Sequence, residues 1–140
     1  MSTEIKVTVG DLKGKMQSRG KRHTGHEVQF DMPPPFGDDD GFTGLESLLA
    51  SLGGCSGHTV LFLLGKMGKT IEKLEVQATG QRREEHPKVL TSIELQYNLK
   101  GNNLDASTVE KAIRMAEEKY CPVWAMLKNN VAISWKCSIG

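Results

Sequence analysis

The sequence carries almost no net charge. Its 140 residues include 18 basic and 17 acidic side chains, which gives a formal net charge of +1 at pH 7. Charges of both signs are scattered along the chain, so no basic field would attract nucleic acid or anionic lipid. We therefore expect neither a nucleic-acid partner nor a membrane partner.

Long apolar runs are also scarce. No stretch approaches the roughly 18 consecutive apolar residues of a membrane-spanning helix, and the longest run, residues 60–64, fits a buried helix. The N-terminal segment MSTEIKVTV alternates polar and apolar residues and lacks the apolar core of a signal peptide. These features predict a cytoplasmic protein.

Cysteines are few, and no C-x-x-C pair is present. Three cysteines, an odd number, argue against a disulfide framework in a reducing compartment and leave redox chemistry, metal binding or buried thiols. A zinc site built from Cys55, His58 and Cys121 would lack the fourth ligand that structural zinc requires. We expect no metal and no cofactor.

The remaining pattern predicts a single α+β domain over residues 1–140. Alternating residues in 4–32 predict two or three antiparallel strands, and the proline, glycine and aspartate residues of 33–41 predict a loop. A capping box formed by Thr43 and Glu46 predicts a helix that runs to about Met67.

Further elements follow this helix. Residues 71–81 and 89–99 predict a hairpin, and a second helix is expected to begin after Ser107, with Glu110 closing its capping box, and to end before Pro122. A helical turn at 123–127 and a strand at 131–135 complete the prediction. The long first helix is apolar on more than one face, which a small domain buries most easily by intertwining two copies. We therefore expect a homodimer.

Gly53 and Gly54 stand directly before Cys55 inside the predicted long helix. Each glycine costs a helix about 1 kcal/mol relative to alanine. Either small residues leave the sulfur accessible and let another backbone approach, or the pair breaks the helix and places Cys55 at a new N-terminus. A cysteine that only fills space in the core is the third interpretation.

Cys121 lies in the segment YCPV, at the expected joint between two helical segments. Cys55 and Cys121 are distant in sequence, and each lies at an irregularity of a helix, which fits a pair that meets in the fold. Cys137, near the C-terminus, is expected to be a bystander.

The segment GLESLLASLGGCSGHTVLFLLGKMG, together with KYCPV, resembles the OsmC/Ohr family of thiol-dependent hydroperoxide reductases. The resemblance covers nearly the whole chain and is strongest to the OsmC-like branch, whose activity is less certain. It implies an intertwined homodimer of antiparallel sheets packed around a long central helix.

The resemblance also implies a mechanism. Cys55 attacks an organic hydroperoxide as a thiolate, releases an alcohol and becomes a sulfenic acid, which condenses with Cys121 to a disulfide. A dithiol reductant of the lipoyl type then reduces the pair. An arginine from the N-terminal strands stabilises the thiolate in this family, and Arg19 is the first candidate, with Arg22 and His58 as alternatives.

Glu46 marks a departure from the peroxidase branch. In that branch a glutamate ten residues before the cysteine orients the arginine, whereas Leu45 stands there in this chain. Glu46, nine residues before Cys55, is turned by about 100° on the helix. Glu46 stays a site candidate, although its capping role explains it without catalysis.

One other function remains open. A small-molecule binding or redox-sensing protein of the same fold would use a pocket of apolar side chains, for which the candidates are Phe62, Met67, Met115, Trp124 and Met126. RNA binding through the GxxG segment 65–68 is disfavoured, because the following residues predict a strand where a KH domain has a helix.

Overall fold

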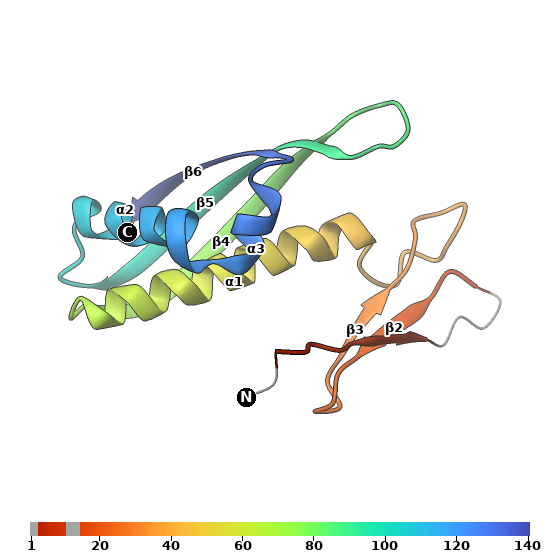
Figure 1. Ribbon diagram of the computed structural model, residues 1–140, viewed down its shortest axis with the longest axis horizontal. Helices are drawn as coiled ribbons and strands as arrows, with labels where there is room; N and C mark the ends of the chain where they lie inside the picture. Colours follow the sequence, from red (N-terminus) through yellow and green to blue (C-terminus); the bar gives the residue numbers. More distant parts are fainter. Residues whose placement is uncertain (1–2, 11–14) are drawn as a thin grey trace. The chain divides into compact units, whose positions relative to one another are not determined.

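A computed structural model describes residues 3–10 and 15–140. The chain forms two compact units, one up to Leu48 and one from Leu49 onward. The helix α1 (Gly44–Lys66) begins in the first unit and continues in the second (Figure 1). Residues 11–14, between the first two expected strands, lie outside the described residues.

The first unit contains a small antiparallel sheet in the order β1-β2-β3. Its strands are β1 (Thr8–Gly10), β2 (Ser18–Lys21) and β3 (Glu27–Phe30). Arg19 is paired with Gln29 across β2 and β3. The prediction of antiparallel strands in this segment is therefore confirmed, with three strands.

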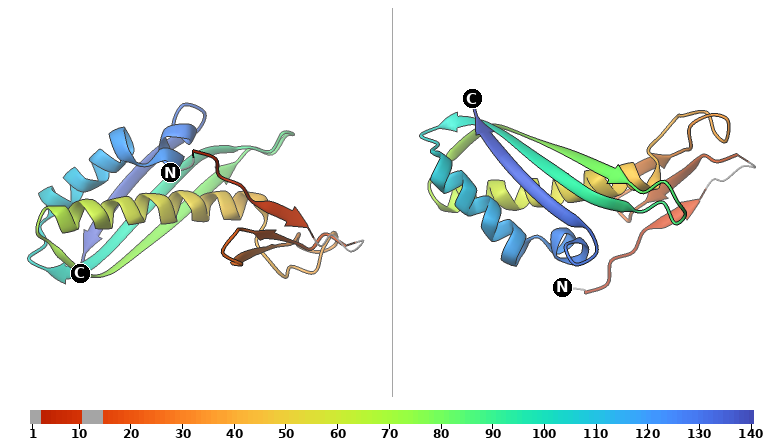
Figure 2. Two further views of the ribbon diagram at one scale, coloured as in Figure 1. Left: turned by 60° about the horizontal axis from the view of Figure 1, so that its bottom comes forward. Right: turned by 90° about the horizontal axis from the view of Figure 1, so that it is seen from above.

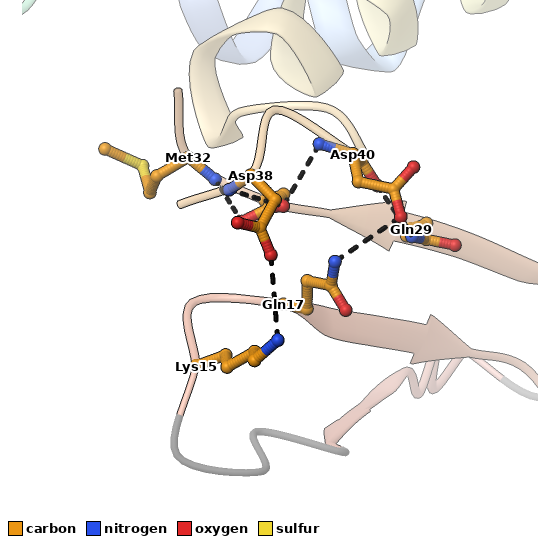
Figure 3. A network of polar contacts seen from close by, with 7 residues as sticks. Lys15, Gln17, Gln29, Met32, Asp38 and Asp40 are labelled. Carbon is orange, nitrogen blue, oxygen red and sulfur yellow. Dashed lines mark hydrogen bonds and ion pairs between the residues drawn. The ribbon is translucent and has the colours of Figure 1, made fainter. Parts of the chain in front are cut away.

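The loop after β3 folds around a buried carboxylate, that of Asp31. Figure 3 labels Met32, Asp38 and Asp40 of this loop. The backbone N–H groups of Met32, Asp38 and Asp40 donate to this carboxylate at 2.7, 3.3 and 3.0 Å. Burial raises the pKa of Asp31, but the three amide donors outweigh it and hold the pKa below its usual value. A side chain at Gly37 would collide with the Met32 carbonyl oxygen and with Asp31. The predicted loop is thus a closed structure with a charged centre.

The predicted capping box begins α1. The Thr43 amide donates to Glu46 Oε1 at 2.9 Å, and the Glu46 amide donates to Thr43 Oγ1 at 3.2 Å. The helix then continues without a break for 23 residues. The interpretation that the glycine pair opens the helix is therefore wrong.

The glycines of α1 instead permit close packing on β4 (Thr70–Arg82). A Cβ atom on Gly57 would lie 3.2 Å from Val76 Cγ2, and one on Gly53 would lie 3.7 Å from Val76 Cγ1. The Cβ of an alanine at Gly54 would meet nothing within 4 Å. Two glycines thus serve the contact between helix and sheet, and Gly54 leaves open space beside Cys55.

The second unit is a sheet in the order β4-β5-β6 with helices on one of its faces (Figure 2). Its further elements are β5 (Leu90–Asn102), α2 (Ala106–Met115), the π-helical turn η1 (Ala116–Tyr120), α3 (Pro122–Leu127) and β6 (Ala132–Ile139). β4 and β5 form the predicted hairpin, but β6 runs parallel to β5. The expectation of antiparallel sheets is wrong for this pair, because the helical connection carries the chain back to the end of the sheet where β5 began.

The second helix also differs from the prediction at both ends. Its N-cap is Asp105, whose side chain accepts from the Thr108 amide at 3.1 Å, so Ser107 and Glu110 do not form the cap. The regular α-helix ends at Met115, and η1 then widens the turn, with the Cys121 amide donating to the Ala116 carbonyl at 2.9 Å. Pro122 begins α3 and thereby ends the preceding helical run.

The core of the second unit lies between α1, the inner face of β5 and the helices α2 and α3. Its largest fully buried side chains are Trp124, Tyr97, Leu52, Leu64, Ile93, Leu95 and Ile113. Among the helices of residues 3–10 and 15–140, α1 is the one that is long and apolar enough to cross a membrane by length and composition, with a mean hydropathy of 1.5 over its most apolar stretch. Counting consecutive apolar residues missed this property because small and polar residues interrupt the helix. The helix-on-sheet layer buries 39% of this stretch and so accounts for part of its apolar composition.

Candidate functional site

The thiols of Cys55 and Cys121 meet inside the second unit. Cys55 lies in the middle of α1 and is partly exposed, whereas Cys121 is 1% exposed at the joint between η1 and α3. Cys55 is close enough to Cys121 to influence the pKa of its thiol, and neither cysteine is in a disulfide. The fold therefore joins two cysteines that are distant in the sequence.

The surroundings of Cys121 keep it protonated. Burial is the largest influence and raises its pKa, the amides of Trp124 and Val123 lower it, and the hydrogen bond and charge interaction with Cys55 raise it further. The resulting pKa is about 11. The pair is chemically asymmetric before any oxidant arrives.

This asymmetry predicts how Cys121 reacts with iodoacetamide. With a pKa of about 11, its thiolate fraction near neutral pH is about 100-fold or more below that of an ordinary cysteine. Peptide-resolved mass spectrometry of the native, reduced protein should find that alkylation of Cys121 rises about tenfold per pH unit until the pH approaches that value.

The urea-unfolded chain is the control for this measurement. If burial only blocked access of the reagent, the native rate would be low but would level off at the same pH as in the unfolded chain. Such a profile would contradict the assigned pKa.

A second polar pair lies behind the thiols, and sequence reasoning missed it. The Tyr97 hydroxyl on β5 donates to Ser56 Oγ at 2.9 Å, and both side chains are fully buried. Burial raises the pKa of Tyr97, and the charges of Cys121 and Glu117 raise it further. The available signal was the alternation of β5, which assigns Tyr97 to the buried face, where a hydroxyl needs a partner.

The π-helical turn η1 immediately precedes Cys121. A turn of this kind is rare and occurs frequently at functional sites. Glu117 of this turn accepts a hydrogen bond from Trp135 Nε1 on β6 at 3.2 Å. This bond connects the turn to the edge strand of the sheet.

A groove of about 460 Å³ begins one turn after Cys55. It is lined by His58, Thr59, Phe62, Leu63, Lys66 and Tyr120. His58, the alternative to Arg19, is exposed. Of the apolar residues proposed for a pocket, Phe62 lines this groove, whereas Trp124 is fully buried in the core.

The other site candidates belong to the first unit. Arg19 lies on β2, with its Nε 3.8 Å from Glu27 Oε2. Arg22 Nη2 lies 3.2 Å from the His23 ring. Glu46 forms the capping box described above.

Cys137 lies in different surroundings from Cys55 and Cys121. It lies on β6 in register with Tyr97, and burial, followed by the charge of Glu110, raises its pKa. Among the described residues, no group of three or more histidine, cysteine or acidic side chains is placed to hold a metal ion.

Comparisons with known proteins place this arrangement among relatives. Residues 37–136 match the family model described as OsmC-like protein. The chain is 33% identical to Protein YhfA of Escherichia coli over 115 residues, which is 82% of this chain and 84% of that protein. A hypothetical protein from Aquifex aeolicus has a similar crystal structure, with a TM-score of 0.82 and 29% identity over 99% of both chains. An organic hydroperoxide resistance protein from Elizabethkingia anophelis shares the fold, with a TM-score of 0.76 and 16% identity over 100% of both chains.

Proposed function

Because the chain belongs to the OsmC-like protein family, we propose that it is a cysteine-based peroxidase that reduces organic hydroperoxides to alcohols. The observation that carries this proposal is the contact between a partly exposed Cys55 and a buried, protonated Cys121. The name of the Elizabethkingia protein, an organic hydroperoxide resistance protein, supports the same chemistry.

The proposed first step breaks the O–O bond. The Cys55 thiolate attacks the terminal oxygen of the hydroperoxide, the S–O bond forms, and the alkoxide takes up a proton and leaves as an alcohol. Cys55 is then a sulfenic acid. The partial exposure of Cys55, beside the open space at Gly54, admits the peroxide to the sulfur.

The second step forms the disulfide. The Cys121 sulfur attacks the Cys55 sulfur, the S–S bond forms, the S–O bond breaks, and the leaving hydroxide combines with the Cys121 proton to give water. The two thiols have then supplied the two electrons that reduced the peroxide. An external dithiol, of the lipoyl type, restores both thiols by exchange.

The proposal includes supporting roles and an assembly. Arg19 provides the positive charge that holds Cys55 ionised, and Glu46 is the carboxylate candidate that orients it. The protein acts in the cytoplasm as an intertwined homodimer. Phe62, which is 63% exposed on α1, belongs to the apolar surface that a second copy covers.

Peroxide treatment and disulfide mapping test this function. The fully reduced protein should consume about one equivalent of an alkyl hydroperoxide per chain, and mass spectrometry should find the Cys55–Cys121 linkage. Cys137→Ser should behave like the wild type. Failure to consume peroxide, with both thiols still reduced, would reject the peroxidase.

The groove beside Cys55 favours a second candidate, a small-molecule binding or redox-sensing protein. Its volume of about 460 Å³ falls within the usual range for small-ligand sites. In that case the cysteines would oxidise slowly, and apolar ligands would bind with the same affinity to the wild type and to Cys55→Ser.

A further inference from the structure

Tyr97 and Ser56 form a closed chain of hydrogen bonds between the sheet and α1. The Tyr97 hydroxyl donates to Ser56 Oγ at 2.9 Å, and Ser56 Oγ lies 3.4 Å from the Gly53 carbonyl oxygen, to which it donates. Both side chains are fully buried. The bond between the two hydroxyls therefore exchanges no partner with water, and its geometry depends on the fold alone.

This chain ends at the turn that carries the reacting sulfur. Ser56 directly follows Cys55, and Gly53 precedes Cys55 by about half a helical turn. Cys121 is also close enough to the Tyr97 hydroxyl to influence its pKa. The phenol thus lies close to both cysteine-bearing segments.

The packing of α1 on β4 around Cys55 indicates what the Tyr97–Ser56 hydrogen bond does. Gly53 and Gly57 face Val76 of β4 without side chains of their own, so at these two positions, on either side of Cys55, no side chain of α1 interlocks with the strand. A hydrogen bond is directional, and it fixes the helix where smooth packing does not.

We propose that Tyr97 is a positioning residue, which acts through Ser56 to hold the Cys55 turn of α1 where its sulfur meets Cys121. The proposal rests on the proposed function only in that the two thiols form a disulfide. A misplacement of about 1 Å between reacting groups can cost about 100-fold in rate, so the loss of one hydroxyl has a measurable effect.

The test is Tyr97→Phe, which removes one oxygen and leaves Ser56 with the Gly53 carbonyl. Equilibration with oxidised dithiothreitol measures the effective concentration of one thiol toward the other: the two protein thiols become a disulfide, and the reagent takes up two electrons and two protons. We expect the variant to lower this effective concentration about tenfold.

Single-turnover kinetics provide the second measurement. Tyr97→Phe should leave the second-order reaction of Cys55 with an alkyl hydroperoxide within about twofold of the wild type and slow the disulfide-forming step about tenfold. Dimedone, which reacts with sulfenic acids, should label more Cys55 in the variant. A residue that only stabilised the fold would not separate these two steps.

Matched variants keep the result specific. Thr91→Val removes a hydroxyl from the same strand, and Val109→Ala destabilises the core of α2 without touching the pair. Ser56→Ala should reproduce the effect of Tyr97→Phe on disulfide formation, and the double variant should add nothing, because both act through one bond.

The outcomes separate the two proposals. If Val109→Ala lowers the effective concentration as much as Tyr97→Phe does, or if Tyr97→Phe leaves it within about twofold of the wild type, the positioning role is overturned. If the expected loss occurs with dithiothreitol but the wild type consumes no peroxide, positioning is supported and the peroxidase is rejected.

Discussion

Replacing Cys55 by serine should abolish hydroperoxide consumption, with a loss of more than about 1,000-fold in the rate of the first turnover. The substitution exchanges one sulfur for one oxygen in an otherwise unchanged helix. A serine hydroxyl stays protonated and is a poor nucleophile toward the O–O bond, and the raised pKa values of Cys121 and Cys137 keep the two remaining thiols protonated. Loss of peroxide from solution, measured with excess dithiol reductant, checks the prediction.

Cys121→Ser is the matched variant for this experiment. It should still consume about one equivalent of peroxide per chain and accumulate a sulfenic acid at Cys55, which dimedone traps. Equal loss of the first turnover in both variants would contradict the assignment of Cys55 as the attacking sulfur. Cys137→Ser should match the wild type in rate and in stoichiometry.

Features that depend on neighbouring residues could be predicted from the sequence. Thr43 and Glu46 form the capping box because both partners lie within one helical turn. Pro122 ends the helical run because its ring acts on the residue before it. The family resemblance rested on the segments around Cys55 and Cys121, and the match over residues 37–136 confirms the family.

Features that depend on distant partners could not be predicted. The direction of β6 is set by the crossover that precedes it, and the alternation of the strand is the same in either direction. The Tyr97–Ser56 hydrogen bond joins residues separated by 41 positions, so no local sequence pattern predicts that these two residues are partners. The N-cap of α2 is a local feature that was nevertheless predicted wrongly, because Asp105 and Ser107, two positions apart, are both suitable capping residues.

The glycines before Cys55 were predicted only in part, because both a local and a long-range explanation fitted them. Sequence reasoning left open whether they break the helix or allow close approach, because either use tolerates the loss of a side chain. The structure selects the second, since Gly53 and Gly57 lie against Val76 and α1 is continuous. The same smooth contact explains why the Cys55 turn gains from a directional hydrogen bond to Tyr97.

The contribution of a positive charge to Cys55 is the next largest effect that we expect. Arg19→Ala should lower the second-order rate constant with an alkyl hydroperoxide by about 100-fold near neutral pH. A neighbouring cation stabilises a thiolate, and its loss moves the pH profile of the reaction to higher pH. The difference between variant and wild type should therefore shrink as the pH rises and the thiolate forms without help. Stopped-flow measurements from neutral to alkaline pH check both the size of the loss in the rate constant and the direction in which the pH profile moves.

Arg22→Ala is the control for this charge effect, because it removes the same guanidinium three residues farther along the chain. If Arg19 is the cation that keeps Cys55 ionised, this variant should change the rate constant by less than about threefold. A larger loss at Arg22 than at Arg19 would assign the role to Arg22. Unchanged rates and pH profiles in both variants would show that neither guanidinium keeps Cys55 ionised, and the activation of the thiol would then have to come from groups within the second unit, with His58 as the first to test.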